Sequence, residues 1–381
     1  MTPRALIRIV APLLALAVIG GSARAAENAA IPPPASPAGR VTWSLADVTS
    51  MALKNHPLIL QSEADVAAAV ARKGQARSAW YPSVNLSTGY TRARAFSATV
   101  NQNITTPNEF AQGDLTWMLY DFGRTGASVD RADANAAVSR ENAATTREDV
   151  AFVATVAFYN VLRADKTLEF QKENLRQRET LFRQASAFYE AGIRAKIDVA
   201  RAEANLYDAR AQLSQAENEL RIARITLLQR IGADGPAGFR LADNLPELTL
   251  PGTLQDWVAE AERNRPELRA LVEKERAATE SLRLARAGYL PFLAGAAEYG
   301  YGADQVPLQQ NYGLSVTLNY PLFSGFQTRE QSKEALAAIS SVRYEFIEAK
   351  RRVRLEVESS AYSVQEAKER LETRKKEREA S

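Results

Sequence analysis

The feature of this chain that most limits its possible folds is an internal duplication. Short motifs recur in the same order, first at a spacing of 209 residues and then at a spacing of 203. The first spacing relates Asn55-His56-Pro57 to Asn264-Arg265-Pro266 and Trp80-Tyr81-Pro82 to Tyr289-Leu290-Pro291; the second relates Leu119-Tyr120-Asp121 to Leu322-Phe323-Ser324. A period of this length is too long for a solenoid repeat, so we predict two copies of one larger unit, residues 42–250 and 251–381.

Each copy is predicted to contain an opening helix, a strand pair and a long helix, in that order. The opening helices are expected at residues 45 to about 79 and 254 to about 287, because Ser44 and Thr253 are suitable N-cap residues. The Asn-x-Pro motif interrupts each of these helices early, since a residue before proline avoids the helical conformation.

Period-two alternation of apolar and small polar residues predicts the strand pairs at 83–120 and 292–320. The first pair is expected as strands 83–92 and 111–120. The clearest alternation lies at 311–320, where one face carries Tyr312, Leu314, Val316, Leu318 and Tyr320. Strands of about ten residues with one apolar face are typical of a transmembrane β-barrel. The edge of a soluble β-sandwich is the alternative.

Four strands cannot close a barrel by themselves. Open edges in lipid would leave backbone groups unpaired, at several kcal/mol each. If the strands span a membrane, several copies must therefore share one barrel, and three copies would supply twelve antiparallel strands.

Residues 127–191 and 193–231 contain neither glycine nor proline, which predicts a helical hairpin at 124–231. The duplication predicts a matching long helix at 326–381. Residues 127–191 alone would span roughly 98 Å as an α-helix. The returning segment carries a coiled-coil seam with steps of three and four residues: Val199, Ala202, Leu206, Ala209, Leu213, Ala216, Leu220, Ala223 and Leu227. Gly192 is expected at the reversal. Such a hairpin is mostly surface, so neighbouring hairpins are needed to cover it.

The N-terminus is typical of a secreted protein. Arg4 and Arg8 precede an apolar run at 9–19, and Ala23-Arg24-Ala25 fits a cleavage site, which predicts a signal peptide at 1–25. The run is too short for a membrane anchor. Residues 26–41 are proline-rich and are expected to form a disordered leader.

Composition excludes several classes of function. The net charge is only +3, so nucleic acid is not an expected partner. The chain has no cysteine and one histidine, His56, which leaves no basis for thiol chemistry, a metal site or a catalytic triad. No nucleophile–base arrangement or phosphate loop is present, so we expect neither an enzyme nor a cofactor.

The ordered set of motifs resembles the TolC-type outer-membrane efflux family, also called outer membrane factors. The resemblance covers residues 42 to 381. It rests on the motifs at the strand starts, the motifs at the strand ends and the segment at the helical reversal: Trp80-Tyr81-Pro82, Leu290-Pro291, residues 119–123, residues 321–325 and residues 191–202.

The resemblance implies a homotrimer with a shared twelve-stranded barrel in outer-membrane lipid and a helical tunnel across the periplasm. It implies two kinds of partner, a periplasmic adaptor and an inner-membrane pump of RND or ABC type. The implied function is a channel-tunnel for efflux or type I secretion of small molecules or polypeptides. A soluble periplasmic coiled-coil scaffold or adhesin is the competing hypothesis. The second copy stops before a tip and return helix, so we expect the sequence to be C-terminally incomplete.

Candidate functional residues fall into three groups. The periplasmic tip carries Gly192, Arg194, Lys196 and Asp198; the resemblance places Asp198 at a pore gate, although it equally suits the first turn of the return helix. The strand–helix junctions carry Pro82, Gly123, Pro291 and Gly325. The membrane-interface aromatics are Tyr90, Trp117, Tyr312 and Tyr320, with ordinary packing as the alternative.

Overall fold

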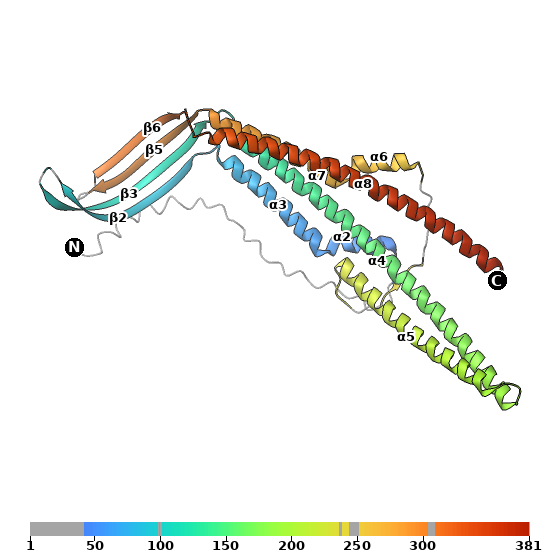
Figure 1. Ribbon diagram of the computed structural model, residues 1–381. Helices are drawn as coiled ribbons and strands as arrows, with labels where there is room; N and C mark the ends of the chain where they lie inside the picture. Colours follow the sequence, from blue (N-terminus) through green and yellow to red (C-terminus); the bar gives the residue numbers. More distant parts are fainter. Residues whose placement is uncertain are drawn as a thin grey trace, which may run out of the picture.

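The computed structural model describes residues 42–97, 99, 101–235, 238–243, 251–303 and 309–380. The predicted signal peptide and the predicted leader at 26–41 lie outside the described residues. A twisted sheet forms one end of the molecule, and long helices extend from it (Figure 1). The predicted fold class, mainly helical with four antiparallel strands, is confirmed.

The sheet is antiparallel throughout, with the strand order β2-β3-β5-β6. Its strands are β2 (Ser83–Ser97), β3 (Gln102–Tyr120), β5 (Phe292–Ala303) and β6 (Gln309–Asn319). The first hairpin is longer than the two short strands that alternation predicts, because pairing continues to Ser97 and Gln102. Ile104 and the threonines at 105 and 106 favour strand there, although apolar and polar residues do not alternate regularly.

The helices repeat the same order in the two halves of the chain. The first half has α2 (Leu45–Asn55), α3 (Pro57–Ser78), α4 (Arg124–Glu190) and α5 (Lys196–Ile231). The second has α6 (Leu254–Asn264), α7 (Pro266–Arg286), the 3-10 turn η2 (Ala287–Tyr289) and α8 (Gln327–Ala380). Ser44 and Thr253 each form a capping box with an aspartate three residues later, so α2 and α6 start alike.

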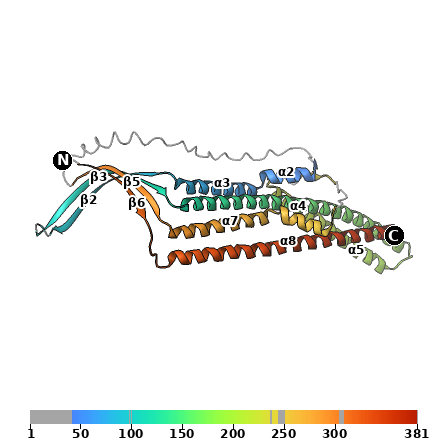
Figure 2. The ribbon, with the colours of Figure 1, turned by 90° about the horizontal axis from the view of Figure 1, so that it is seen from above.

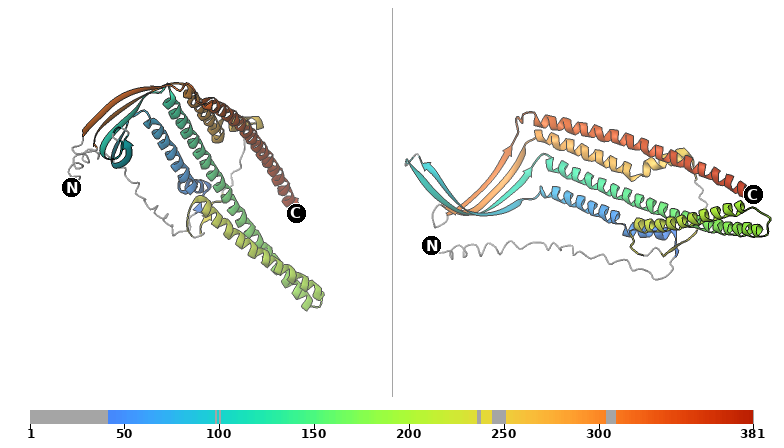
Figure 3. Two further views of the ribbon diagram at one scale, coloured as in Figure 1. Left: turned by 60° about the vertical axis from the view of Figure 1, so that its left-hand side comes forward. Right: turned by 60° about the horizontal axis from the view of Figure 1, so that its bottom comes forward.

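Four helices lie side by side and continue from one end of the sheet, in the order α3, α4, α7 and α8 (Figures 2 and 3). Helix α5 returns along the far half of α4 and ends near α2, so the α4–α5 hairpin projects away from the sheet. This arrangement is one layer of helices.

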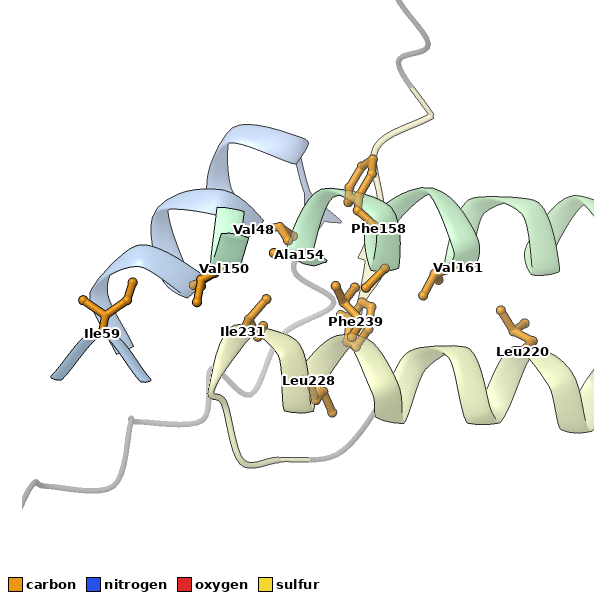
Figure 4. Packing of buried hydrophobic residues seen from close by; sticks show 13 residues of the cluster. Val48, Ile59, Val150, Ala154, Phe158, Val161, Leu220, Leu228, Ile231 and Phe239 are labelled. Atoms are coloured by element: carbon orange, nitrogen blue, oxygen red, sulfur yellow. The ribbon is translucent and has the colours of Figure 1, made fainter. Parts of the chain in front are cut away.

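The main hydrophobic core lies where α2, α4 and α5 meet, midway along the helical part (Figure 4). Val48 of α2, Phe158 of α4 and Ile231 of α5 are at most 1 % exposed. The short parallel pair β1 (Thr42–Trp43) and β4 (Arg240–Leu241) closes one side of this core, with Trp43 stacked on Phe239 at 4.4 Å between ring centroids. The core fixes the end of α5 and therefore the direction of the hairpin.

Candidate conducting path

The register of the sheet separates its residues into an apolar and a polar face. Pairing aligns Val84 with Leu115, Ala297 and Leu314 across the four strands. Because directly paired residues share a face, the apolar face is continuous over the whole sheet. Its members remain largely exposed, with Leu314 84 % and Val84 71 % accessible. A contiguous apolar surface of this kind requires a lipid or protein environment.

The opposite face of the sheet carries small and polar side chains, which include an acidic pair. Asp114 of β3 lies directly opposite Glu298 of β5. Gln112 lies on the same face, and its Nε2 donates to Asp114 Oδ1 at 2.5 Å and to Glu298 Oε2 at 3.4 Å. The pair spans the two halves of the chain, so its formation depends on the β3–β5 register and could not be found from either repeat alone.

The four predicted interface aromatics lie on different rows of the sheet, eight residues apart within each pair of Tyr90 with Trp117 and Tyr312 with Tyr320. Tyr90 lies opposite Glu109 and Tyr312 opposite Tyr299, toward the hairpin ends. Trp117 and Tyr320 lie toward the helices, and Trp117 Nε1 donates to the carbonyl oxygen of Trp80 at 2.9 Å. Glu109 and Trp117 are eight residues apart on β3, about 27 Å along a strand. A strand tilt of about 40° reduces this to roughly 21 Å along the membrane normal, slightly less than the roughly 25 Å apolar band of outer-membrane barrels.

The strand–helix junctions use two consecutive left-handed residues. In the first copy these are Phe122 (φ 53°) and Gly123 (φ 91°), and in the second they are Gly325 (φ 62°) and Phe326 (φ 66°). Glycine adopts this left-handed conformation readily, whereas phenylalanine adopts it at an energetic cost. The predicted glycines therefore lie at the turns, but each has a strained phenylalanine beside it that the sequence did not reveal.

Capping and burial fix these junctions further. The carboxylate of Asp121 accepts from the backbone N–H of Gly123 at 3.1 Å and of Thr125 at 2.6 Å. Thr125 and its repeat equivalent Thr328 are 8 % and 6 % exposed, and among the described residues they are the buried polar ones. Pro82 precedes β2 and Pro291 precedes β5, where their missing N–H groups break no ladder bond.

The predicted tip is a Schellman turn. Gly192 has φ 74°, its N–H donates to the Tyr189 carbonyl at 2.9 Å, and the Ile193 N–H donates to the Phe188 carbonyl at 2.8 Å. Asp198 lies in the first turn of α5, with its carboxylate 3.7 Å from the Arg194 guanidinium.

The tip also presents apolar side chains that the sequence reasoning passed over. Ile193 and Ile197 are 69 % and 58 % exposed. They lie on either side of the exposed cations Arg194 and Lys196. Exposed apolar side chains next to cations are common on protein-binding surfaces.

The pKa values of two side chains on the helices are shifted by their surroundings. A hydrogen bond from Lys73 holds the pKa of Asp133 below its ordinary value of 3.8, and Arg276 contributes to the same shift. Partial burial, with a smaller contribution from Arg230, lowers the pKa of His56 below 6.5. The neutral His56 ring accepts from the Leu58 N–H at 3.2 Å and so caps α3.

Membrane-spanning helices and metal-binding clusters are both absent from the described residues. No helix in this part of the chain combines the length and apolarity to cross a membrane. No group of three or more histidine, cysteine or acidic side chains is arranged to hold a metal ion there.

The fold and the two-faced sheet define the chain as a β-strand and helical-hairpin channel subunit. The sequence pattern of the family described as outer membrane efflux protein matches residues 48–233 and 257–381, one segment in each copy. Protein CyaE of Bordetella pertussis is 26 % identical over 344 residues, covering 84 % of this chain and 72 % of its own length. Outer membrane protein TolC of Vibrio cholerae is 24 % identical, over 77 % of this chain and 68 % of its own.

Solved structures show the same fold. A membrane protein from Pseudomonas aeruginosa aligns with a TM-score of 0.73 at 23 % identity, over 85 % of this chain and 78 % of that one. The outer membrane protein VceC from Vibrio cholerae aligns with a TM-score of 0.72 at 17 % identity, over 86 % and 80 %.

The chain belongs to the outer membrane efflux protein family. It is a non-enzymatic outer-membrane channel of the TolC type that extends into the periplasm, and its family implies a trimer and efflux-pump partners. The competing hypothesis, a soluble periplasmic scaffold or adhesin, is therefore wrong.

Proposed function

We propose that three copies of this chain close one twelve-stranded barrel and one helical tunnel, through which small molecules or polypeptides leave the periplasm. The observation that carries the proposal is the two-faced sheet. Its outer strands β2 and β6 have no further strand partner among the described residues. Unpaired edges beside an apolar face are costly in lipid, and pairing β6 of one copy with β2 of the next removes both edges.

The duplication predicts which helices meet between copies. Within one chain, α4 packs against α7, and Arg269 pairs with Glu141 at 3.1 Å. In the ring order α3, α4, α7, α8, the equivalent seam lies between α8 of one copy and α3 of the next. The residues equivalent to Arg269 and Glu141 are Leu60 and Tyr344, which are 43 % and 73 % exposed. We propose that Leu60 contacts Tyr344 of the neighbouring copy.

Cysteine trapping tests this arrangement, since the chain has no native cysteine. The variant Leu60→Cys with Tyr344→Cys is expected to give covalent trimers when membranes are oxidised. The matched variant Arg269→Cys with Glu141→Cys is expected to give only an intramolecular disulfide and monomers on a denaturing gel. If the first variant gives monomers as well, neighbouring copies do not meet along α3 and α8, and the proposed ring is wrong.

The inner partners are proposed to bind at the helical tip. Ile193 and Ile197, flanked by Arg194 and Lys196, suit a periplasmic adaptor that links the channel to an RND or ABC pump of the inner membrane. Ile197→Asp is expected to abolish copurification of the adaptor while trimers persist. Ile225→Asp, at an equally exposed position on α5 (57 % against 58 %), is the control. Undiminished adaptor binding by Ile197→Asp would place the docking site elsewhere.

Asp198 is proposed to give the tunnel a preference for cations near the tip. Three carboxylates around one axis attract cations, although Arg194 offsets part of this charge within each copy. In planar bilayers, Asp198→Asn is expected to lower the cation-to-anion permeability ratio, and Asp208→Asn on α5 serves as the control. Equal ratios for Asp198→Asn and the wild-type channel would leave Asp198 with its role in the first helical turn alone.

A further inference from the structure

Two arginines lie on the apolar side of the sheet, beyond its aromatic residues. The β2–β3 hairpin extends past the last pair of β5 and β6, which is Gly302 with Gln309. On this extension Arg92 lies opposite Pro107, and Arg94 lies opposite Thr105. Side chains alternate between the two faces of a strand, and Arg92 and Arg94 lie an even number of residues from Leu86 and Tyr90. They therefore continue the apolar face outward.

Neither guanidinium has an ion-pair or hydrogen-bond partner among the described residues, and both side chains are exposed. The acid on this face of the hairpin, Glu109, lies opposite Tyr90 and forms no ion pair with either arginine within the described chain. The opposite face of the extension is uncharged at Thr91, Ala93, Thr106 and Asn108. The charge is therefore confined to the side that faces away from the lumen.

The depth of Arg92 matches a headgroup layer, and Arg94 lies just beyond it, from where its long side chain can reach back. Arg92 is two residues and Arg94 four residues beyond Tyr90, about 7 and 13 Å along the strand. A strand tilt of about 40° reduces these to roughly 5 and 10 Å along the membrane normal. The headgroup layer is about 5–7 Å thick on each side of the hydrocarbon core. Because the helices extend into the periplasm from the other end of the sheet, this layer belongs to the outer leaflet.

We propose that Arg92 and Arg94 bind the phosphate groups of a phosphorylated outer-leaflet lipid. A guanidinium matches phosphate in a bidentate geometry and is weakly hydrated, which suits this depth. Exposed arginines at a membrane surface each add several-fold to the affinity for anionic lipid. The proposal rests on the barrel described above, because only a membrane-spanning sheet turns this face toward lipid.

The test measures lipid binding to the detergent-solubilised trimer by native mass spectrometry. The probes are lipid A with both phosphates and the same lipid A without phosphates. Arg92→Gln with Arg94→Gln is expected to bind the phosphorylated probe roughly 30-fold more weakly, about fivefold for each arginine, and the other probe unchanged. Arg178→Gln with Arg221→Gln, exposed on α4 and α5, is the matched control and should bind both probes like the wild type.

Two outcomes would overturn the proposal. Wild-type affinity of the Arg92 and Arg94 double variant would show that the arginines do not contact phosphate. Equal loss of both probes would show that they act through packing rather than charge. Insertion of the trimer into planar bilayers is measured in parallel, so that failure of the barrel itself is distinguished from failure of the lipid site.

Discussion

Substituting Gly232 by alanine tests whether the end of α5 is locked against the turn between α2 and α3. Gly232 has φ 65°, and a Cβ atom there would lie 2.9 Å from the Asn55 carbonyl oxygen and 3.0 Å from His56 Cα. Both neighbours are backbone atoms. Ile231 is fully buried in the core beside it, so the end of α5 cannot simply withdraw. The contact must therefore be relieved by shifting one helix end against another.

The expected loss has two parts. A left-handed alanine costs about 1 kcal/mol relative to glycine. Forcing the close contact apart in a packed core costs about 1–3 kcal/mol more. The total for Gly232→Ala is about 2–4 kcal/mol of unfolding free energy, measured by denaturant unfolding of the detergent-solubilised trimer followed by helical circular dichroism.

Two other glycines separate these parts. Gly192 also has a positive φ, 74°, but its Cβ would meet nothing within 4 Å, so Gly192→Ala should lose only about 1 kcal/mol. Gly126 lies inside α4 with open space around it, so Gly126→Ala should gain up to about 1 kcal/mol. If Gly232→Ala costs no more than Gly192→Ala, the contact with the α2–α3 turn does not hold α5, and the reasoning is refuted.

Three further changes give distinct readouts. His56→Ala should cost about 1 kcal/mol at pH 7.5 through the lost cap. Because the folded pKa of His56 is below 6.5, its contribution is present above pH 6.5 and is lost as the pH falls through the folded value, so the variant should show a shallower fall in stability from pH 7 to 5.5. Asp133→Asn should lower the unfolding free energy by about 0.5–1 kcal/mol at pH 7. Well below pH 3.8 it should change nothing, because the native carboxylate is then protonated and neutral like the asparagine. Gly89→Ala places a Cβ 2.7 Å from the Phe110 ring on the polar face, which should push the ring into the lumen and lower single-channel conductance, whereas Gly113→Ala on the apolar face should not.

The sequence predicted features that depend on local periodicity. Alternation identified the apolar face of β6, and Gly192 marked the reversal between α4 and α5. The length of the first hairpin was not predicted, since apolar and polar residues do not alternate regularly along residues 93–97 and 102–110. The left-handed Phe122 and Phe326 were missed because the bulk of phenylalanine argues against that conformation, and the surrounding structure overrides the preference.

Contacts between segments far apart in the chain lay outside any sequence argument. Asp114 meets Glu298 only through the β3–β5 register, which neither copy specifies alone. The burial of Thr125 and Thr328 depends on how each junction packs against the preceding helix; a Cβ on Gly288 would lie 2.9 Å from Thr328 Cγ2. In both cases the missing information was the relative position of segments far apart in the chain.

The α4–α7 seam within the chain differs in chemistry from the proposed α8–α3 seam between copies. Within one chain, three α7 arginines spaced by seven residues pair with three α4 acids at 3.1–3.5 Å: Arg269, Arg276 and Arg283 with Glu141, Asp133 and Asp130. Pairs this exposed contribute at most about 1 kcal/mol each, so they set the register of helices that the chain already holds together.

The proposed seam between copies has no covalent link and would have to supply association free energy. The positions equivalent to the three arginines are Leu60, Ala67 and Gly74, and two of the acids are replaced by Leu336 and Tyr344. These apolar side chains are exposed in the single chain, Leu336 by 48 % and Tyr344 by 73 %, and burying them stabilises association by about 25 cal/mol for each Å² removed from water. The third acid, Asp130, is replaced by Lys333, which pairs with Glu330 of its own helix at 2.8 Å. At the other positions the duplicated residues have diverged from ionic within the chain to apolar or small at the proposed seam.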